Sequence, residues 1–565
     1  MSYLQRRIAL LVNELKQGKL KLSKDIMESE AGVQLRNDLL SIQKLPNGEI
    51  DLSSCSSLVK STAKTLYLVK RSTELENQKE QNSTIVSPDA ISIVMKEYFQ
   101  ILEDFFIDVT GIRPDKFAAH SSFSEQIHKN AERISQKIPK TWEKYIPAIL
   151  NFHEKNTSLL LNAGKSIGGL KNVMGGNSRF SQSAFDGLRK FALYTDTIFI
   201  PDPILPWVEI ERKEEKFRYA RLLEACHDLL RLKPLVDANL PYPAVVVFPS
   251  WEKSLERYDN QTQDGISELM LSFFSYYLNA TFEDESEIVN YVTNSGKEHF
   301  FETVERHQLF FAPNAKSILP INEAIKQYKN EISTWRSKEW MDAIEKEPPE
   351  LLVLNGIMER IPPQFHMRDN AFTLDAQPLF WLDPHFHYFR LCSEAGNNGL
   401  KDEGLLNPKT LATLQSLLHP NLAWLGNVPI KDLARMREEN QNEVFRRKLS
   451  SYIGDLSESR LGNVDQVAAE VTRAIASLLA EHDKEAKRIN DEYDKKHTTT
   501  TIPLSLLTIG VSFYPWLAPF LGTSAMLAPV GKAAFDFYNK SRDNRTLART
   551  LTGVLSAAHN NRNNI

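Results

Sequence analysis

Hydrophobic residues recur at three- and four-residue steps through most of the first 160 positions, which is the spacing of one buried helix face. The N-terminus opens with such a stripe, formed by Leu4, Ile8, Leu11 and Leu15. A second helix is expected to begin after Ser87, a preferred N-cap residue, with Pro88 in its first turn. The pattern therefore predicts an N-terminal helical domain over residues 1–162.

Glycine is concentrated between positions 164 and 176, where five of the 23 glycines stand close together. Glycine weakens helices and strands because it loses more backbone entropy on folding than other residues. We therefore expect residues 163–180 to form a glycine-rich linker or loop.

Short apolar runs separated by a charged helical segment follow this stretch. Residues 197–200 and 244–248 have strand character, and residues 211–233 between them have a helical pattern. A strand, a crossover helix and a strand make a parallel α/β unit. Further strands are expected in two apolar runs, at residues 351–361 and 372–382. We predict a mixed α/β domain over residues 181–425.

Helical periodicity returns after residue 426. One helix is expected over residues 430–455, and another from Asn463, which forms a capping-box pattern with Gln466. Apolar side chains then follow at helical steps, so we predict a long helical hairpin over residues 426–497. The fold class is mainly α and multi-domain, with a small α/β region in the middle.

The segment Thr498–Gly531 has 34 residues and no charged side chain. Its 15 large apolar side chains would cost on the order of 20 kcal/mol to leave in water, more than the stability of a domain. The segment must therefore be covered by its own protein, by a partner or by lipid. The side chains expected to make that contact are Leu506, Ile509, Phe513, Trp516, Leu517 and Phe520.

Three prolines, Pro515, Pro519 and Pro529, interrupt this segment. Because proline breaks helices, one straight transmembrane span is not expected, and a turn near Pro515 predicts an apolar hairpin followed by a C-terminal helix in residues 498–565. Burial inside the C-terminal domain, a subunit interface and membrane insertion all stay open.

The composition of the 565-residue chain is that of an ordinary globular protein, with 42% hydrophobic and 25% charged residues. The 68 basic residues are balanced by 72 acidic ones, so nothing indicates nucleic-acid binding. Three widely spaced cysteines indicate a reducing compartment, and the charged, amphipathic N-terminus does not resemble a signal peptide. We expect a cytoplasmic protein, peripheral to a membrane if the apolar segment binds lipid.

A weak anion site is suggested by Gly164, Lys165 and Ser166, which match the end of a phosphate-binding loop. Leu159 stands where such a loop needs glycine, so nucleotide hydrolysis is not expected. Lys165 and Lys171 remain candidates for binding an anion.

Histidines suggest a weak metal site. Asp383, His385 and His387 form a short run, with His366 upstream. In a strand, His385 and His387 would point to the same face as a metal-binding pair. The aromatic residues around them favour buried structural histidines instead, and we expect no metal and no cofactor.

Carboxylates near the predicted strands suggest an enzyme site. Asp202 follows the first strand and Glu252 the second, where parallel sheets bind ligands. Asp196, inside the first strand, could hold a divalent ion together with Glu252. Thr195, Asp196 and the apolar run after them resemble the opening of PIN-type nucleases over a small part of the chain, which implies carboxylates that hold Mg²⁺. Ile198 and Phe199 stand where those enzymes carry a polar residue.

Our leading hypothesis is a non-catalytic interaction or effector protein of a bacterial cell, with a protein partner or self-association. Its apolar hairpin would insert into or associate with a membrane on a trigger. The alternative is a metal-dependent hydrolase or nuclease that uses Asp196, Asp202 and Glu252.

Overall fold

The computed structural model describes residues 3–457 with gaps, and isolated positions between 470 and 480. The longer gaps lie at residues 19–29, 65–86, 117–122, 176–184, 210–214, 403–428 and 458–469. The capping box at Asn463 and the apolar segment 498–531, with its six predicted contact residues, lie outside the described residues. The described chain is mostly helical and contains one small parallel sheet, in agreement with the predicted class.

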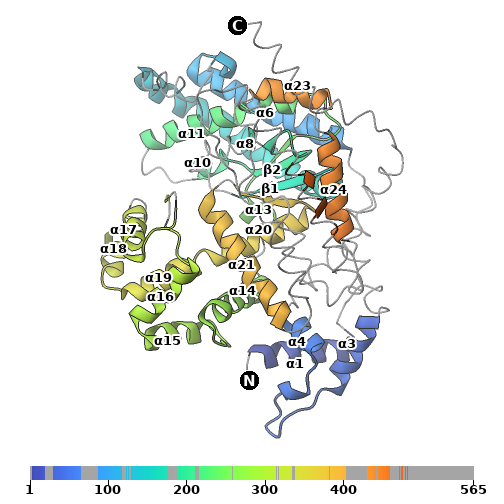
Figure 1. Ribbon diagram of the computed structural model, residues 1–565. Coiled ribbons are helices and arrows are strands. Elements are labelled where there is room, and N and C mark those ends of the chain that lie inside the picture. The colour runs from blue at the N-terminus through green and yellow to red at the C-terminus, as the bar shows by residue number, and fades with distance from the viewer. Residues whose placement is uncertain are drawn as a thin grey trace.

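The N-terminal helices form a small core of their own around Ile8, Leu11, Leu39 and Val59. Its elements are α1 (Tyr3–Lys16), α3 (Glu30–Ser41), the 3₁₀ turn η1 (Leu52–Ser54) and α4 (Ser57–Lys64). These helices are drawn in blue in Figure 1. Arg7 Nη1 donates to Asp264 Oδ2 at 2.8 Å, which fastens this unit to the helix α14 (Asn260–Leu278).

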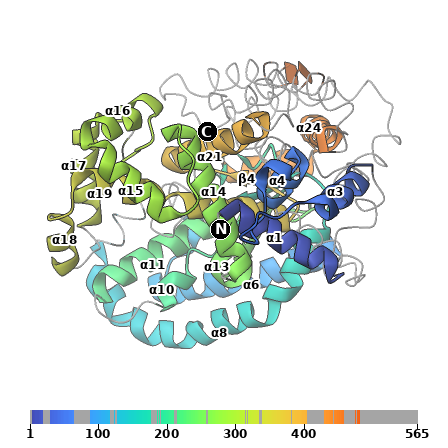
Figure 2. The same ribbon diagram turned by 90° about the horizontal axis from the view of Figure 1, so that it is seen from below.

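Two long helices, α6 (Pro88–Thr110) and α8 (Ala131–Ser166), pack side by side (Figure 2). The short turn η2 (Pro114–Lys116) follows α6. The predicted start of α6 is confirmed, because Ser87 accepts a hydrogen bond from the Asp89 amide and Pro88 occupies the first turn. Gly111 ends the helix in the left-handed conformation, with φ of 72°.

The sheet has four parallel strands in the order β3-β2-β1-β4. The strands are β1 (Lys171–Met174), β2 (Thr197–Pro201), β3 (Val245–Phe248) and β4 (Gln377–Leu379). The helices after β2 and β3 are α10 (Leu205–Glu209), α11 (Glu215–Leu230), α12 (Lys233–Asp237) and α13 (Trp251–Ser254). The predicted strand, helix and strand over residues 197–248 are therefore confirmed.

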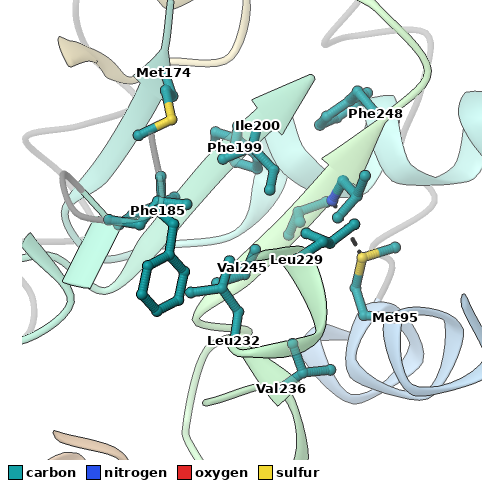
Figure 3. Close-up of a cluster of buried hydrophobic side chains, with 14 of the residues drawn as sticks. Met95, Met174, Phe185, Phe199, Ile200, Leu229, Leu232, Val236, Val245 and Phe248 are labelled. Carbon is teal, nitrogen blue, oxygen red and sulfur yellow. Dashed lines mark hydrogen bonds between the residues drawn. The ribbon is translucent and has the colours of Figure 1, made fainter. Parts of the chain in front are cut away.

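The sheet is buried on both faces, as parallel sheets usually are. Phe199 packs against Gly164 of α8, and its ring meets Phe248 in an edge-to-face contact. The edge strand β3 is covered by α6, since Met95 Sδ accepts a hydrogen bond from the Val247 amide at 3.2 Å (Figure 3). One core thus joins α6 and α8 to the sheet.

Of the stretch 163–180 that we expected as a linker, residues 163–175 provide instead the end of α8 and strand β1, and residues 176–180 lie outside the described chain. Gly164 allows α8 to approach the sheet, because a Cβ there would stand 3.2 Å from Phe199. Gly169 turns the chain into β1 with φ of +84°. These glycines mark close packing and a tight turn, which is why their density misled the sequence analysis.

Gly169→Ala is expected to destabilise the chain by about 2 kcal/mol or more. An L side chain at this φ costs roughly 1–2 kcal/mol, and the new Cβ would also stand 2.8 Å from Asp196 Oδ2. Urea unfolding measures the loss. Gly175→Ala is the control, because its Cβ would meet only the flexible side chain of Met367 at 3.3 Å. Equal losses in the two variants would contradict the prediction.

A second core is entirely helical. Besides α14 it contains α15 (Glu285–Ser295), α16 (Lys297–His307), α17 (Ile321–Ile332), α18 (Lys338–Ile344), α19 (Pro349–Met358), α20 (Ile361–Thr373) and α21 (Asp383–Asp402). The strand predicted over residues 351–361 is wrong, because this run forms most of α19 and the start of α20. Of the strand predicted over residues 372–382, only β4 is a strand.

The helix predicted over residues 430–455 is two helices, α23 (Ile430–Glu438) and α24 (Glu443–Ser457). Asn440 lies between them in the left-handed conformation, with φ of 57°. In the part of the chain that the structure describes, no helix is both long and apolar enough to cross a membrane.

Candidate functional site

A buried polar network lies at the carboxyl end of β2, the edge where parallel sheets bind ligands. Asp202 Oδ2 accepts hydrogen bonds from Tyr98 Oη of α6 and from His153 Nε2 of α8, the latter at 2.7 Å. Asp202 Oδ1 accepts from the Ile204 amide at 2.7 Å. All three side chains are buried, with exposed fractions of 0% for Tyr98, 5% for His153 and 2% for Asp202.

The Asp202 side chain organises the hydrogen bonds of its neighbours. Carboxylate oxygens accept hydrogen bonds, so His153 Nε2 is the donor to Asp202 Oδ2. His153 Nδ1 is then buried without a hydrogen-bond partner among the described residues. Burial, with the Asp202 charge, raises the pKa of Tyr98 well above its usual value and also raises the pKa of the Cys226 thiol. Tyr98 therefore stays a donor, and the network ties α6 and α8 to the end of the strand.

Asp202 was predicted as a site residue because it follows a strand, whereas Tyr98 and His153 were not predicted. They stand 104 and 49 residues from Asp202 in the sequence and belong to no motif. Only the folded chain brings them together.

A second polar group lies where the strand order reverses, between β1 and β4. Trp251 Nε1 donates to the Met174 carbonyl at the end of β1, at 2.9 Å. Near it, Glu256 Oε1 accepts from Asn370 Nδ2 at 3.4 Å, and Glu256 Oε2 lies 3.9 Å from His366 Nδ1. His366 is thus partnered by Glu256 and belongs to α20.

The amino end of β2 holds a third polar group, centred on Asp196. Its Oδ2 accepts from the Leu170 amide and its Oδ1 from Arg446 Nε of α24, both at 2.8 Å. The Asp196 carbonyl accepts from Arg437 Nη2 of α23 at 2.7 Å. Arg437 and Arg446 stood in no sequence motif, so this group was also missed.

The structure does not bring the three predicted carboxylates together. Asp196 and Asp202 flank opposite ends of β2, about 20 Å apart at roughly 3.3 Å per residue. Glu252 is exposed on α13, near the carboxyl end of the sheet. The proposed pairing of Asp196 with Glu252 around one metal ion is therefore not supported by their positions.

The two lysines predicted to bind an anion, Lys165 and Lys171, lie at the C-terminal end of α8. Lys171 Nζ donates to the carbonyls of Gly164 and Lys165 at the C-terminus of α8, at 3.2 and 3.4 Å. It also lies 3.8 Å from Asp375 Oδ2. Because a helix C-terminus carries partial negative charge, Lys171 caps α8 and the site disfavours an anion.

The predicted histidine pair is not on a strand. His385 and His387 belong to α21, where residues two apart point in different directions. His387 Nε2 donates to the Gln308 carbonyl at 2.7 Å, and burial lowers the pKa of both histidines to about 4. Among the described residues, no three histidine, cysteine or carboxylate side chains are grouped as metal ligands would be.

Comparison with models of protein families, with curated proteins and with solved structures found no match to the chain.

Proposed function

We propose that the chain is a non-catalytic interaction or effector protein of a bacterial cell that associates with a membrane through its C-terminal apolar segment. The single observation that carries this proposal is the segment Thr498–Gly531, which has 34 residues without a charge. In this proposal the helical and α/β body carries the apolar segment, which follows α23 and α24 in the sequence.

The positions of the carboxylates favour this function over metal-dependent hydrolysis. Asp202 is fully engaged by Tyr98, His153 and the Ile204 amide, and Asp196 by Arg446 and the Leu170 amide. A metal ion would have to displace these buried partners, which costs free energy because each displaced donor would lose its acceptor. Asp196 and Asp202 thus stabilise the fold, which supports the interaction hypothesis over metal-dependent hydrolysis at these two residues.

Flotation with liposomes tests the proposal. The full chain is expected to float with vesicles, and a version that ends at His497 is expected to stay at the bottom. A full-length control, Phe513→Asp with Trp516→Asp, places two charges in the segment and should also fail to float, because charges are costly in hydrocarbon. If the full chain stays soluble while the shortened one aggregates or unfolds, the segment belongs to the core and the proposal is wrong. Burial of the segment against a protein partner or a second copy of the chain, with no flotation of the full chain, would also contradict it.

A further inference from the structure

Among the side chains of α24 that the structure describes, Tyr452 packs half-buried against the main core. Of the described residues of α24, only Phe445 and Arg446 are buried. The neighbouring helix α23 buries four apolar side chains in the main core, those of Ile430, Leu433, Ala434 and Met436. The break at Asn440 separates α23 from α24, so the two helices can be held to the sheet independently.

Arg446 makes the polar attachment of α24. Its Nε donates to Asp196 Oδ1 at 2.8 Å and its Nη1 to the Leu193 carbonyl at 3.1 Å. The ion pair is nearly dry, because the two side chains are 6% and 16% exposed. Phe445 adds one ring contact with Tyr194, at 5.9 Å between centroids. Asp196 therefore holds α24 beside the sheet (Figure 1).

When α24 is docked beside the sheet, which we call the closed state, the guanidinium groups of Arg437 and Arg446 both lie close to Asp196. Arg437 donates to the Asp196 carbonyl and is 4% exposed, yet its Nε has no hydrogen-bond partner among the described residues. Burial and the nearby charge of Arg446 lower the pKa of Arg437 to about 10. Repulsion between the two arginines opposes the docking of α24, so the closed state depends on the charge of Asp196.

We propose that Asp196 and Arg446 form a latch that an anionic membrane surface opens, an inference that rests on the proposed function. In the closed state Asp196 neutralises Arg446. In the open state Arg446 joins Arg447 and Lys448 in a run of three cations, which an anionic surface attracts. Because the anionic surface binds the open state better, it shifts the population toward that state, in which α24 is released from the sheet.

Hydrogen exchange of the full chain without vesicles tests the latch itself. In Asp196→Asn, which keeps the shape and the acceptor for the Leu170 amide, the amides of α24 are expected to exchange at least about tenfold faster while those of α6 do not change. Asp375→Asn is the matched control, since Asp375 faces Lys171 near the same edge of the sheet. Arg446→Gln removes the other partner of the ion pair, and it serves as the second variant if Asp196→Asn does not fold. Unchanged exchange of α24 in both latch variants would overturn the latch.

Flotation of the same variants tests the link to the membrane. Vesicles that contain phosphatidylserine should recruit Asp196→Asn several-fold more than the unmodified chain. Vesicles of phosphatidylcholine alone should show a smaller difference between these two proteins. Faster exchange of α24 without increased flotation would overturn the membrane trigger and leave the latch, whereas flotation of no protein at all would refute the proposed function.

Discussion

Asp202→Ala is expected to lower the free energy of unfolding by about 3–5 kcal/mol, because it removes the acceptor from three buried donors at once. The Tyr98 hydroxyl, His153 Nε2 and the Ile204 amide all donate to this carboxylate. With alanine in its place the first two would remain dry and without an acceptor, since the Tyr98 and His153 side chains are held inside two packed helices. Urea unfolding followed by circular dichroism measures the loss.

Tyr98→Phe is the matched control for this prediction. It removes one donor and leaves the carboxylate two partners, so the loss should be about 1–2 kcal/mol. The phenyl ring keeps the stacking on Phe152, at 4.6 Å between centroids. A loss for Asp202→Ala no greater than that for Tyr98→Phe would mean that the carboxylate does not organise the network.

Acidification from pH 6.5 to pH 4 is expected to destabilise the chain through His385 and His387. Burial lowers the pKa of both side chains to about 4, against 6.5 when the chain is unfolded. Above pH 6.5 both states are neutral and stability is complete. Between pH 6.5 and 4 the unfolded chain binds protons that the folded chain does not, so stability falls as the pH falls. At about 1.4 kcal/mol per pKa unit, each histidine accounts for roughly 3 kcal/mol.

The double variant His385→Gln, His387→Gln isolates this contribution. Its free energy of unfolding at pH 7 will differ from that of the unmodified chain. Between pH 6.5 and 4, the slope of this free energy against pH should be smaller, by the equivalent of up to two bound protons. Urea unfolding at several pH values gives this slope. The same slope in both proteins would show that the two histidines titrate normally in the folded state.

The sequence predicted correctly those elements that depend only on residues close to one another in the chain. Ser87 and Pro88 announce the start of α6 because capping needs only neighbouring residues. The valine-rich run of β3 also signalled its own structure. The strand predicted over residues 351–361 was wrong because α19 buries Leu352, Val353, Leu354 and Ile357, and a nearly continuous apolar run shows no helical periodicity. Its best signal was Pro349 in the first turn, a helix start that the apolar run obscured.

The candidate sites depended on contacts that no local pattern records. Asp202 was found because it follows a strand, yet its partners Tyr98 and His153 lie on two other elements. Asp196 was expected to bind a metal ion, and the structure gives it Arg446, which is 250 residues away. Glycine density misled for the same reason, since Gly164 is required by its distance to Phe199 and not by any feature of its neighbours in sequence.

The helices α20 and α21 each bury side chains in both large cores. Met367 and Ala371 of α20 belong to the core around the sheet, while Phe365 of the same helix belongs to the all-helical core. In α21, Phe389 and Leu391 are divided in the same way. A recombinant fragment that ends before α20 would lack β4 and the side chains that α20 and α21 contribute to both cores, so we expect it to be less stable than the full chain.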